Sequence, residues 1–182
     1  EHVPASGIEV ACSAIAAATR SGGYDAVLVA GGDGSFRMAA SALLGTRLPV
    51  GLIPLGTGNV LAHELGLPTG AHELAYALID GPIVEVRSAT ANGAPFFLMA
   101  GAGFDGAVMA RLDQTLKHAL GKLAYVPPVL HALTAPLPRL QVTIDGARHE
   151  ASWAVVANAR FYGGRFVLVP HTHVQDVGLH TV

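Results

Sequence analysis

Two stretches, Ala26–Ser35 (AVLVAGGDGS) and Pro49–Asn59 (PVGLIPLGTGN), decide the fold predicted for this chain. Each begins with a short apolar run and then passes into a glycine-rich turn. An apolar run of this length between turn signals is typical of a strand that is buried on both faces. Helical patterns follow the turns, over Phe36–Leu44 and from Val60 onward. The order strand, glycine turn, helix therefore occurs twice, which predicts an α/β fold with a parallel sheet.

The same texture extends over the first 82 residues. Apolar residues recur at helical spacing over Ile8–Arg20 and Ala71–Ile79. The second of these helices is stopped by Asp80-Gly81-Pro82, and the pattern of the chain changes after it. We therefore predict two domains, an α/β domain over residues 1–82 and a second domain over residues 83–182.

The second domain is predicted to be β-rich and antiparallel. Its short apolar segments are separated by turns such as Asn92-Gly93 and Asp145-Gly146, pairs that favour two-residue hairpins. A helical stretch over about 107–133 interrupts the segments and is expected to be bent or broken at Pro127-Pro128. The predicted strands are Ile83–Ala91, Pro95–Ala100, Leu140–Ile144, Ser152–Ala157 and Arg165–Val169.

Composition excludes several classes of function. The chain has 182 residues, of which 51% are hydrophobic and 13% charged, far from the composition of disordered proteins. A net charge of −2 leaves no basic surface for nucleic acid, so no nucleic-acid partner is expected. The single cysteine, Cys12, excludes a disulfide framework and a cysteine-based zinc site. No uncharged stretch reaches about 18 clean apolar residues, so no membrane-spanning helix is predicted.

The first glycine-rich turn, Gly31–Ser35, has the chemistry of a phosphate site. Glycines let a polyphosphate approach the main chain, and the following helix offers its N-terminal dipole to an anion. Ser35 can cap that helix or donate to a phosphate oxygen. Asp33 suits a second task, holding Mg²⁺ or accepting a proton from an attacking hydroxyl. A tight turn with Asp33 as a helix cap explains the same residues without any ligand.

The second turn supports the first. Gly56 and Gly58 open the backbone, while Thr57 and Asn59 offer a hydroxyl and an amide. Because parallel strands end at the same sheet edge, both turns are expected at the edge where α/β folds bind nucleotides. Neither turn is a P-loop or a dinucleotide motif.

Taken with GLIPLGTGNVLAHELGLP (51–68), the GGDGS motif (31–35) resembles the catalytic domain of the diacylglycerol kinase and sphingosine kinase family, close to its bacterial lipid kinases. Later segments resemble the family in the same order along the chain. They are GAGFDG (101–106), LGKLAYV (120–126), ANARFYGGRFVLVP (157–170) and QDVGL (175–179).

The resemblance implies an NAD-kinase-like nucleotide-binding domain followed by a β-sandwich-like domain. It implies ATP- and Mg²⁺-dependent phosphoryl transfer to diacylglycerol or a sphingoid-like lipid, in the cytoplasm with peripheral contact at the inner membrane face. Asp33 and Asp105 match catalytic carboxylates. The Mg²⁺ would be held by the Asp176 carboxylate and the backbone carbonyls of His173 and Gly178. The residues matching ATP contacts are Gly31, Gly32, Asp33, Gly34, Ser35, Gly56, Thr57, Gly58 and Asn59.

The chain also departs from the family pattern. Val177 follows Asp176 where the family has glycine, which weakens the metal assignment. The family's first strand would precede Glu1 and its last section would follow Val182, so we expect an incomplete and inactive fragment. An NAD kinase-like enzyme, which shares GGDG, and a non-catalytic nucleotide-binding module remain alternatives.

Other polar residues receive plainer interpretations. Lys117, His118 and Lys122 are expected on a solvated helix face, with contact to a lipid headgroup as the alternative. Glu64 and Asp113 show no partner in the sequence pattern and are expected in solvent.

Overall fold

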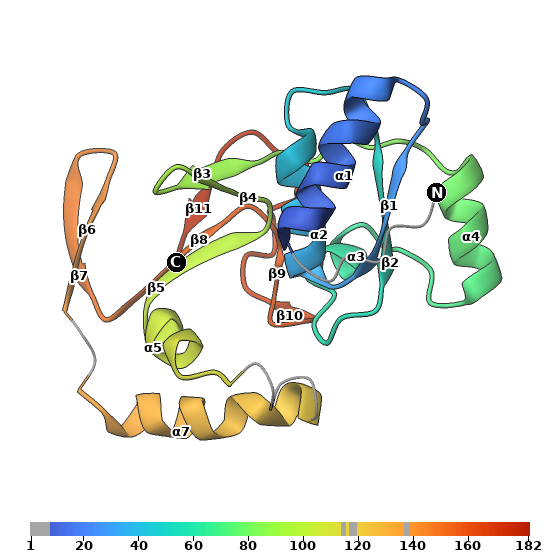
Figure 1. The fold of residues 1–182 in the computed structure, drawn as a ribbon. Helices are drawn as coiled ribbons and strands as arrows, with labels where there is room; N and C mark the ends of the chain where they lie inside the picture. The colour runs from blue at the N-terminus through green and yellow to red at the C-terminus, as the bar shows by residue number, and fades with distance from the viewer. Residues whose placement is uncertain (1–7, 114–115, 117–119, 137–138) are drawn as a thin grey trace. The chain divides into compact units, whose positions relative to one another are not determined.

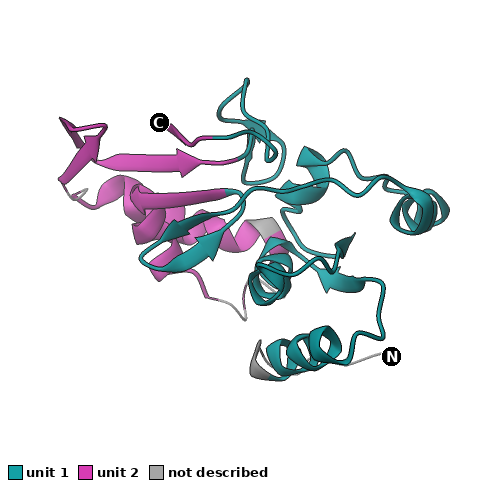
Figure 2. Ribbon diagram, turned by 90° about the horizontal axis from the view of Figure 1, so that it is seen from above, with its two compact units in different colours: residues 1–98, 159–177 teal, residues 99–158, 178–182 magenta. Residues whose placement is uncertain are grey.

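A computed structural model describes residues 8–113, 116, 120–136 and 139–182 of the chain. It is a mixed α/β structure (Figure 1) that divides into two compact units (Figure 2). The first unit combines Glu1–Leu98 with Ala159–Val177, and the second combines Met99–Asn158 with Gly178–Val182. The predicted domain boundary at residue 82 stays a prediction.

The first unit contains the predicted parallel strand pair. Strands β1 (Val27–Gly31) and β2 (Val50–Pro54) pair in parallel, in register from Val27 opposite Val50 to Gly31 opposite Pro54. Helix α1 (Ile8–Ser21) packs on α2 (Asp33–Leu43), and both cover the strands through a buried cluster of Ile15, Ala39 and Leu43. The α/β prediction is therefore confirmed in its coarse form.

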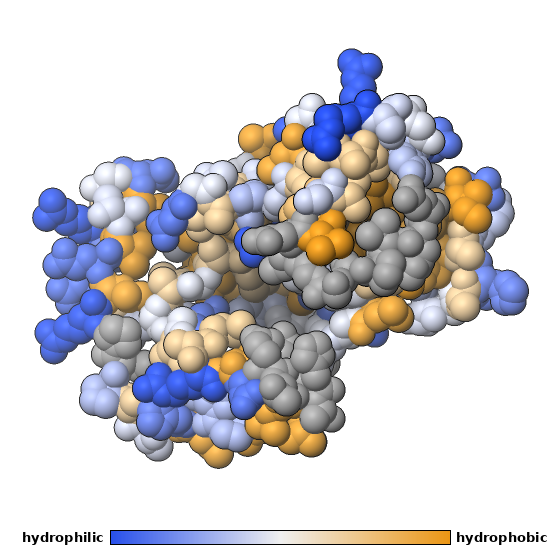
Figure 3. Space-filling view, viewed as in Figure 1, coloured by the Kyte–Doolittle hydropathy of each residue, from blue (hydrophilic) through white to orange (hydrophobic). Residues whose placement is uncertain are grey.

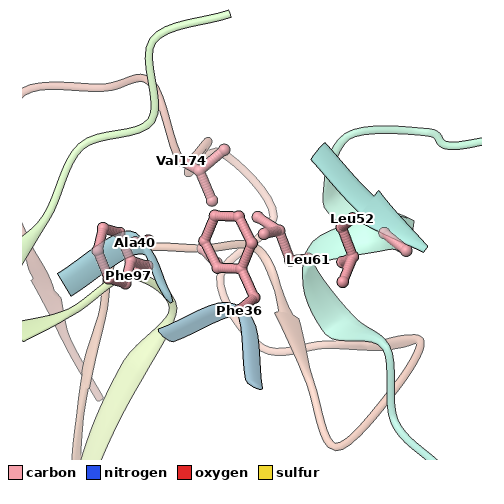
Figure 4. Close-up of a cluster of buried hydrophobic side chains, with 8 residues drawn as sticks. Phe36, Ala40, Leu52, Leu61, Phe97 and Val174 are labelled. Atoms are coloured by element: carbon pink, nitrogen blue, oxygen red, sulfur yellow. The ribbon is translucent and has the colours of Figure 1, made fainter. Parts of the chain in front are cut away.

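A larger core joins distant parts of the first unit. Phe36 of α2, Leu52 of β2 and Leu61 of α3 (Val60–Glu64) pack together with Phe97 and Val174 (Figure 4). The Phe36 and Phe97 rings meet edge to face, with centroids 5.6 Å apart. The remaining elements of this unit are α4 (Ala71–Asp80), β3 (Ala89–Ala91), β4 (Ala94–Phe96), β9 (Phe161–Tyr162) and β10 (Phe166–Val167).

The second unit is built on an antiparallel sheet in the order β11–β8–β5. A separate hairpin pairs two further strands through Asp145-Gly146, which both have positive φ as a two-residue hairpin turn requires. The elements are β5 (Met99–Gly103), α5 (Phe104–Ala110), η1 (Gly121–Tyr125), α7 (Val126–Thr134), β6 (Leu140–Ile144), β7 (Ala147–Ala151), β8 (Trp153–Ala157) and β11 (His180–Thr181).

Several predicted boundaries are wrong. The predicted helix over 107–133 is divided into separate helical pieces, and one of the divisions falls directly before Pro127-Pro128, close to where a bend or break was predicted. Pro127 lies in the first turn of α7, where its missing N–H costs nothing. The strand predicted over Ile83–Ala91 is reduced to β3, and the one over Arg165–Val169 to β10. Strand β7 was not predicted, because its sequence is polar and exposed over most of its length.

Candidate functional site

The two glycine-rich turns lie side by side at the carboxyl ends of β1 and β2. The Leu55 N–H donates to the Gly31 carbonyl at 2.9 Å, directly beyond the last strand pair. A Cβ added to Gly56 would stand 2.5 Å from the Gly32 Cα, and one added to Gly32 would stand 3.1 Å from the Gly56 Cα. The backbones can approach this closely because both positions are glycine.

The GGDGS motif is not the open loop that was predicted. Helix α2 begins at Asp33, three residues earlier than expected, and Gly32 is its N-cap residue. Asp33, Gly34 and Ser35 therefore form the first helical turn, so Ser35 does not cap the helix, and its alternative role as a donor to phosphate stays a prediction. The N–H groups of a first helical turn have no partner within the helix and favour an anion. At Gly34 an added Cβ would meet nothing within 4 Å, so this turn has open space beside it.

Asp33 connects the two turns. Its Oδ2 accepts a hydrogen bond from the Val60 N–H and its Oδ1 one from the Leu61 N–H, each at 3.0 Å. These are the first two residues of α3, so Asp33 caps a helix that begins 27 residues further along the chain. The cap that the sequence suggested for Asp33 exists, but it serves α3 and not the helix that carries Asp33.

Asn59 fixes the shape of the second turn. It adopts a left-handed backbone with φ 48°. Its Oδ1 accepts from the Gly56 N–H at 2.9 Å, and its Nδ2 donates to the carbonyls of Gly56 at 2.7 Å and Pro54 at 3.2 Å. The side chain is thus used by the turn itself, whereas Thr57 at the tip is exposed and can meet a ligand.

Glu64 is a residue whose position the sequence analysis missed. It was expected in solvent, but only 3% of it is exposed. Its Oε2 accepts hydrogen bonds from the N–H groups of Arg160 at 3.1 Å and Phe161 at 3.3 Å. No local pattern could have signalled this contact, since the partners lie 96 and 97 residues away.

Asp105 lies in the second compact unit, in the first turn of α5. The helix follows Gly103, whose φ of 78° favours glycine. The Asp105 carboxylate lies against the backbone of Gly101, where any added Cβ would collide with Oδ2. Asp105 therefore sits at a strand–glycine–helix junction like that of Asp33, within a different unit.

The predicted metal loop forms a closed turn. The His173 N–H donates to the Asp176 Oδ2 at 2.7 Å, and the Asp176 N–H donates to the His173 carbonyl at 2.9 Å. Asp176 is exposed, and its carboxylate and the His173 carbonyl are oxygen ligands of the kind that Mg²⁺ prefers. The third predicted ligand, the Gly178 carbonyl, belongs to the other compact unit. In the described part of the chain, no three His, Cys, Asp or Glu side chains gather as a metal site.

Two further findings concern the membrane and the predicted basic face. Across the residues described, no helix is both long enough and apolar enough to cross a bilayer. Lys117 and His118 of the predicted basic helix face lie outside the described residues.

Comparisons with known proteins agree with the resemblance carried by the two turns. A diacylglycerol kinase from Mycobacterium tuberculosis is 34% identical over 165 residues, which cover 85% of this chain and 53% of that protein. A YegS-like protein of Pseudomonas aeruginosa, named a probable lipid kinase, is 32% identical over 162 residues, covering 85% and 52%. The chain thus spans about half the length of these relatives.

Solved structures show the same similarity. A crystal structure of a diacylglycerol kinase from Bacillus anthracis has a TM-score of 0.73 to this chain at 26% identity, covering 98% of this chain and 59% of that one. Residues 5–91, which contain both glycine-rich turns, match the family model described as the diacylglycerol kinase catalytic domain. The predicted resemblance is therefore confirmed: the chain is similar to proteins with a diacylglycerol kinase catalytic domain.

Proposed function

We propose that this chain is part of an ATP- and Mg²⁺-dependent lipid kinase that phosphorylates a hydroxyl of diacylglycerol or a related lipid. The observation that carries the proposal is the pairing of the two glycine-rich turns through Asp33 at one sheet edge. The names of the relatives give the lipid class. Within this proposal, the first unit contributes an NAD-kinase-like nucleotide domain and the antiparallel sheet a β-sandwich-like domain.

The proposed chemistry follows from the residues of the two turns. The free N–H groups in the first turn of α2 would bind ATP phosphate beside the open space at Gly34, and Thr57 would donate its hydroxyl to the nucleotide. Phosphoryl transfer asks mainly for positioning and charge neutralisation, which fixed backbone donors supply. Asp33 would keep α3 and the second turn in place and present negative charge to the reacting centre, and Asp105 would accept the hydrogen bond of the lipid hydroxyl.

The magnesium assignment rests on the closed turn at His173. The carboxylate of Asp176 and the carbonyls of His173 and Gly178 would hold the ion, whose charge would neutralise the phosphates. The His173–Asp176 hydrogen bonds fix this turn before any ion binds.

Peripheral membrane contact is also part of the proposal. Helix α7 exposes Val126, Leu130 and Leu133, with Leu130 59% and Leu133 66% accessible, and their spacing of four and three residues places them on one side of the helix. The space-filling view shows hydrophobic side chains at the surface where α7 lies (Figure 3). The sequence over 114–144 contains Lys117, Lys122 and Arg139 but no acidic residue, which suits an anionic lipid surface. Changing both leucines to serine should lower binding to vesicles that contain anionic lipid, measured by flotation, without lowering the Tm.

A transfer assay tests the proposed function. The protein is incubated with labelled ATP, Mg²⁺ and vesicles that contain diacylglycerol, in parallel with NAD as the acceptor. The test is run on the 182-residue chain, which is expected to be inactive, and on any longer form that the gene encodes. Labelled phospholipid would support the proposal, and labelled NADP would support the NAD kinase-like alternative. ATP binding without transfer to either acceptor, by both forms, would support a non-catalytic nucleotide-binding module.

A further inference from the structure

Helix α3 is held at both ends by carboxylates that bond to residues far away in the sequence. Asp33 receives the N–H groups of Val60 and Leu61 at its start, and Glu64 at its end receives those of Arg160 and Phe161. All these residues lie in the first compact unit. The helix has five residues, too few to be stable by itself, so its placement depends on these contacts.

Glu64 is poorly explained as a residue that only adds stability. Only 3% of Glu64 is exposed, and its Oε1 has no hydrogen-bond partner among the described residues. Burial of a carboxylate with an unpaired oxygen carries a cost in free energy that an apolar side chain would avoid. Such local costs are expected where a residue serves the site more than the fold.

The segment that Glu64 holds leads to the proposed metal loop. The Arg160 carbonyl accepts from the N–H groups of Leu168 at 2.9 Å and Val169 at 3.3 Å, and the Val169 carbonyl accepts from the Thr172 N–H at 3.3 Å. The closed turn between His173 and Asp176 follows immediately. A continuous series of hydrogen bonds therefore runs from Glu64 to the residues beside Asp176.

The same segment has a second anchor at its far end. Val174, inside the closed turn, is fully buried and packs in the same core cluster as Leu61 of α3 (Figure 4). Its carbonyl accepts from the Arg87 N–H at 2.8 Å. Residues 160–176 are thus attached to α3 at two places, at Glu64 and near Leu61. Because Asp33 is bonded to the start of the same helix, these contacts fix the position of residues 160–176 relative to Asp33.

We infer that Glu64 is a positioning residue: it holds residues 160–176 against α3 and thereby sets the place of Asp176, the proposed magnesium ligand, relative to the paired glycine turns. The inference rests on the proposed function for its kinetic consequence. Glu64 itself is buried and is not assigned a contact with substrate. Second-layer residues that orient metal ligands typically change metal affinity or activity by about 10–100-fold when removed.

The kinetic test uses the form of the protein that transfers phosphate. It compares Glu64→Ala and Glu64→Gln with Glu73→Ala, which removes an exposed carboxylate from α4. Glu64→Ala should raise the Mg²⁺ concentration for half-maximal activity about 10-fold while KM for ATP changes less than about twofold. Glu64→Gln should restore most of the wild-type value, because its amide oxygen can accept both N–H groups. Glu73→Ala should match the wild type. Equal Mg²⁺ dependence in all four proteins would overturn the inference.

A second measurement is independent of activity. In Glu64→Ala, amide hydrogen exchange should quicken at 160–161 and over 168–176 but not in α1, and Glu64→Gln should stay near the wild type. Unchanged exchange over 168–176 in Glu64→Ala would overturn the inference even if the enzyme is a lipid kinase. If neither the 182-residue chain nor any longer form that the gene encodes transfers phosphate, the proposed function fails, and the exchange result still decides whether Glu64 positions the loop. Should Glu64→Ala not fold, Glu64→Asp, which keeps the charge but is one methylene shorter, replaces it in both measurements.

Discussion

Two junctions of the same local design, β1–α2 and β5–α5, place their carboxylates in different ways. Each strand ends in glycine, and each helix has an aspartate in its first turn, Asp33 or Asp105. Asp33 reaches away from its own helix and caps α3 with both oxygens. Asp105 lies back against its own strand, over Gly101.

The difference shows that a strand–glycine–helix pattern determines where in the helix the aspartate lies but not which groups its carboxylate contacts. The contact of Asp33 is set by a second turn that the parallel register brings alongside. The Asp105 carboxylate can lie over Gly101 because that residue has no side chain. We therefore expect the two aspartates to respond differently to the same change.

The largest effect is expected from Asp33→Asn. The amide keeps one acceptor oxygen for α3 but supplies no negative charge and accepts no proton, so kcat should fall at least about 100-fold. The lost cap should cost about 1 kcal/mol of stability, which thermal unfolding measures separately. Steady-state kinetics of the form of the protein that transfers phosphate, with ATP and lipid varied, give kcat. An unchanged kcat with a lowered Tm would show that Asp33 serves only as the cap of α3.

The next effect tests how closely the turns of the first junction are packed. In Gly56→Ala the new Cβ would stand 2.5 Å from the Gly32 Cα and 2.8 Å from the Asn59 Oδ1. The backbones must separate, so we expect a loss of about 1–3 kcal/mol in the free energy of unfolding by urea. Gly23→Ala, where an added Cβ meets nothing within 4 Å, is the matched control. Equal stability of both variants would show that the turns are not pressed together.

Asp105→Asn should have a smaller and more selective effect. The proposed function has Asp105 accept the hydrogen bond of the lipid hydroxyl. On that proposal the apparent KM for lipid should rise about 10-fold, which corresponds to about 1.4 kcal/mol, while ATP binding stays nearly intact. The measurement is kinetics with each substrate varied in turn. A rise of equal size in KM for ATP would contradict the division of work between the two junctions.

The smallest change in stability is expected at the open glycines of the two helices. Gly34→Ala and Gly106→Ala each add a methyl group that meets nothing within 4 Å, so each should raise stability by up to about 1 kcal/mol. Calorimetry should show weaker ATP binding for Gly34→Ala alone, because the methyl group enters the space proposed for phosphate. Equal ATP affinity in both variants would show that the phosphate does not bind beside Gly34 of α2.

Local sequence predicted much of the fold where each element is defined by its own residues. The apolar runs became β1 and β2, and the Asp145-Gly146 pair gave its hairpin turn. The start of α2 was placed too late because the glycines in GGDGS disfavour a helix interior. That cost is tolerated at the first turn, where the helix is held by the packing of Phe36.

Contacts between distant residues escaped prediction. Glutamate is seldom fully buried, so the sequence favoured solvent for Glu64, and only the folded chain brings Arg160 and Phe161 to it. The glycine positions of the site were predicted, but the pairing of Asp33 with α3 needs the register of β1 with β2. Side-chain partners at such separations leave no periodic signal in either stretch.

The shortness of α3 bears on how the chain acquires its structure during synthesis. A five-residue helix is not stable by itself. The hydrogen bonds at its two ends join residues that are separated by 27 positions at Asp33 and by 96 positions at Glu64. When residues up to 100 have left the ribosome, Asp33 can already bind the start of α3, but Glu64 lacks its partners until residues 160 and 161 emerge. The glycine turns would therefore reach their final rigidity only after residues 160 and 161 have been made, and closure of such a long loop is expected to slow folding.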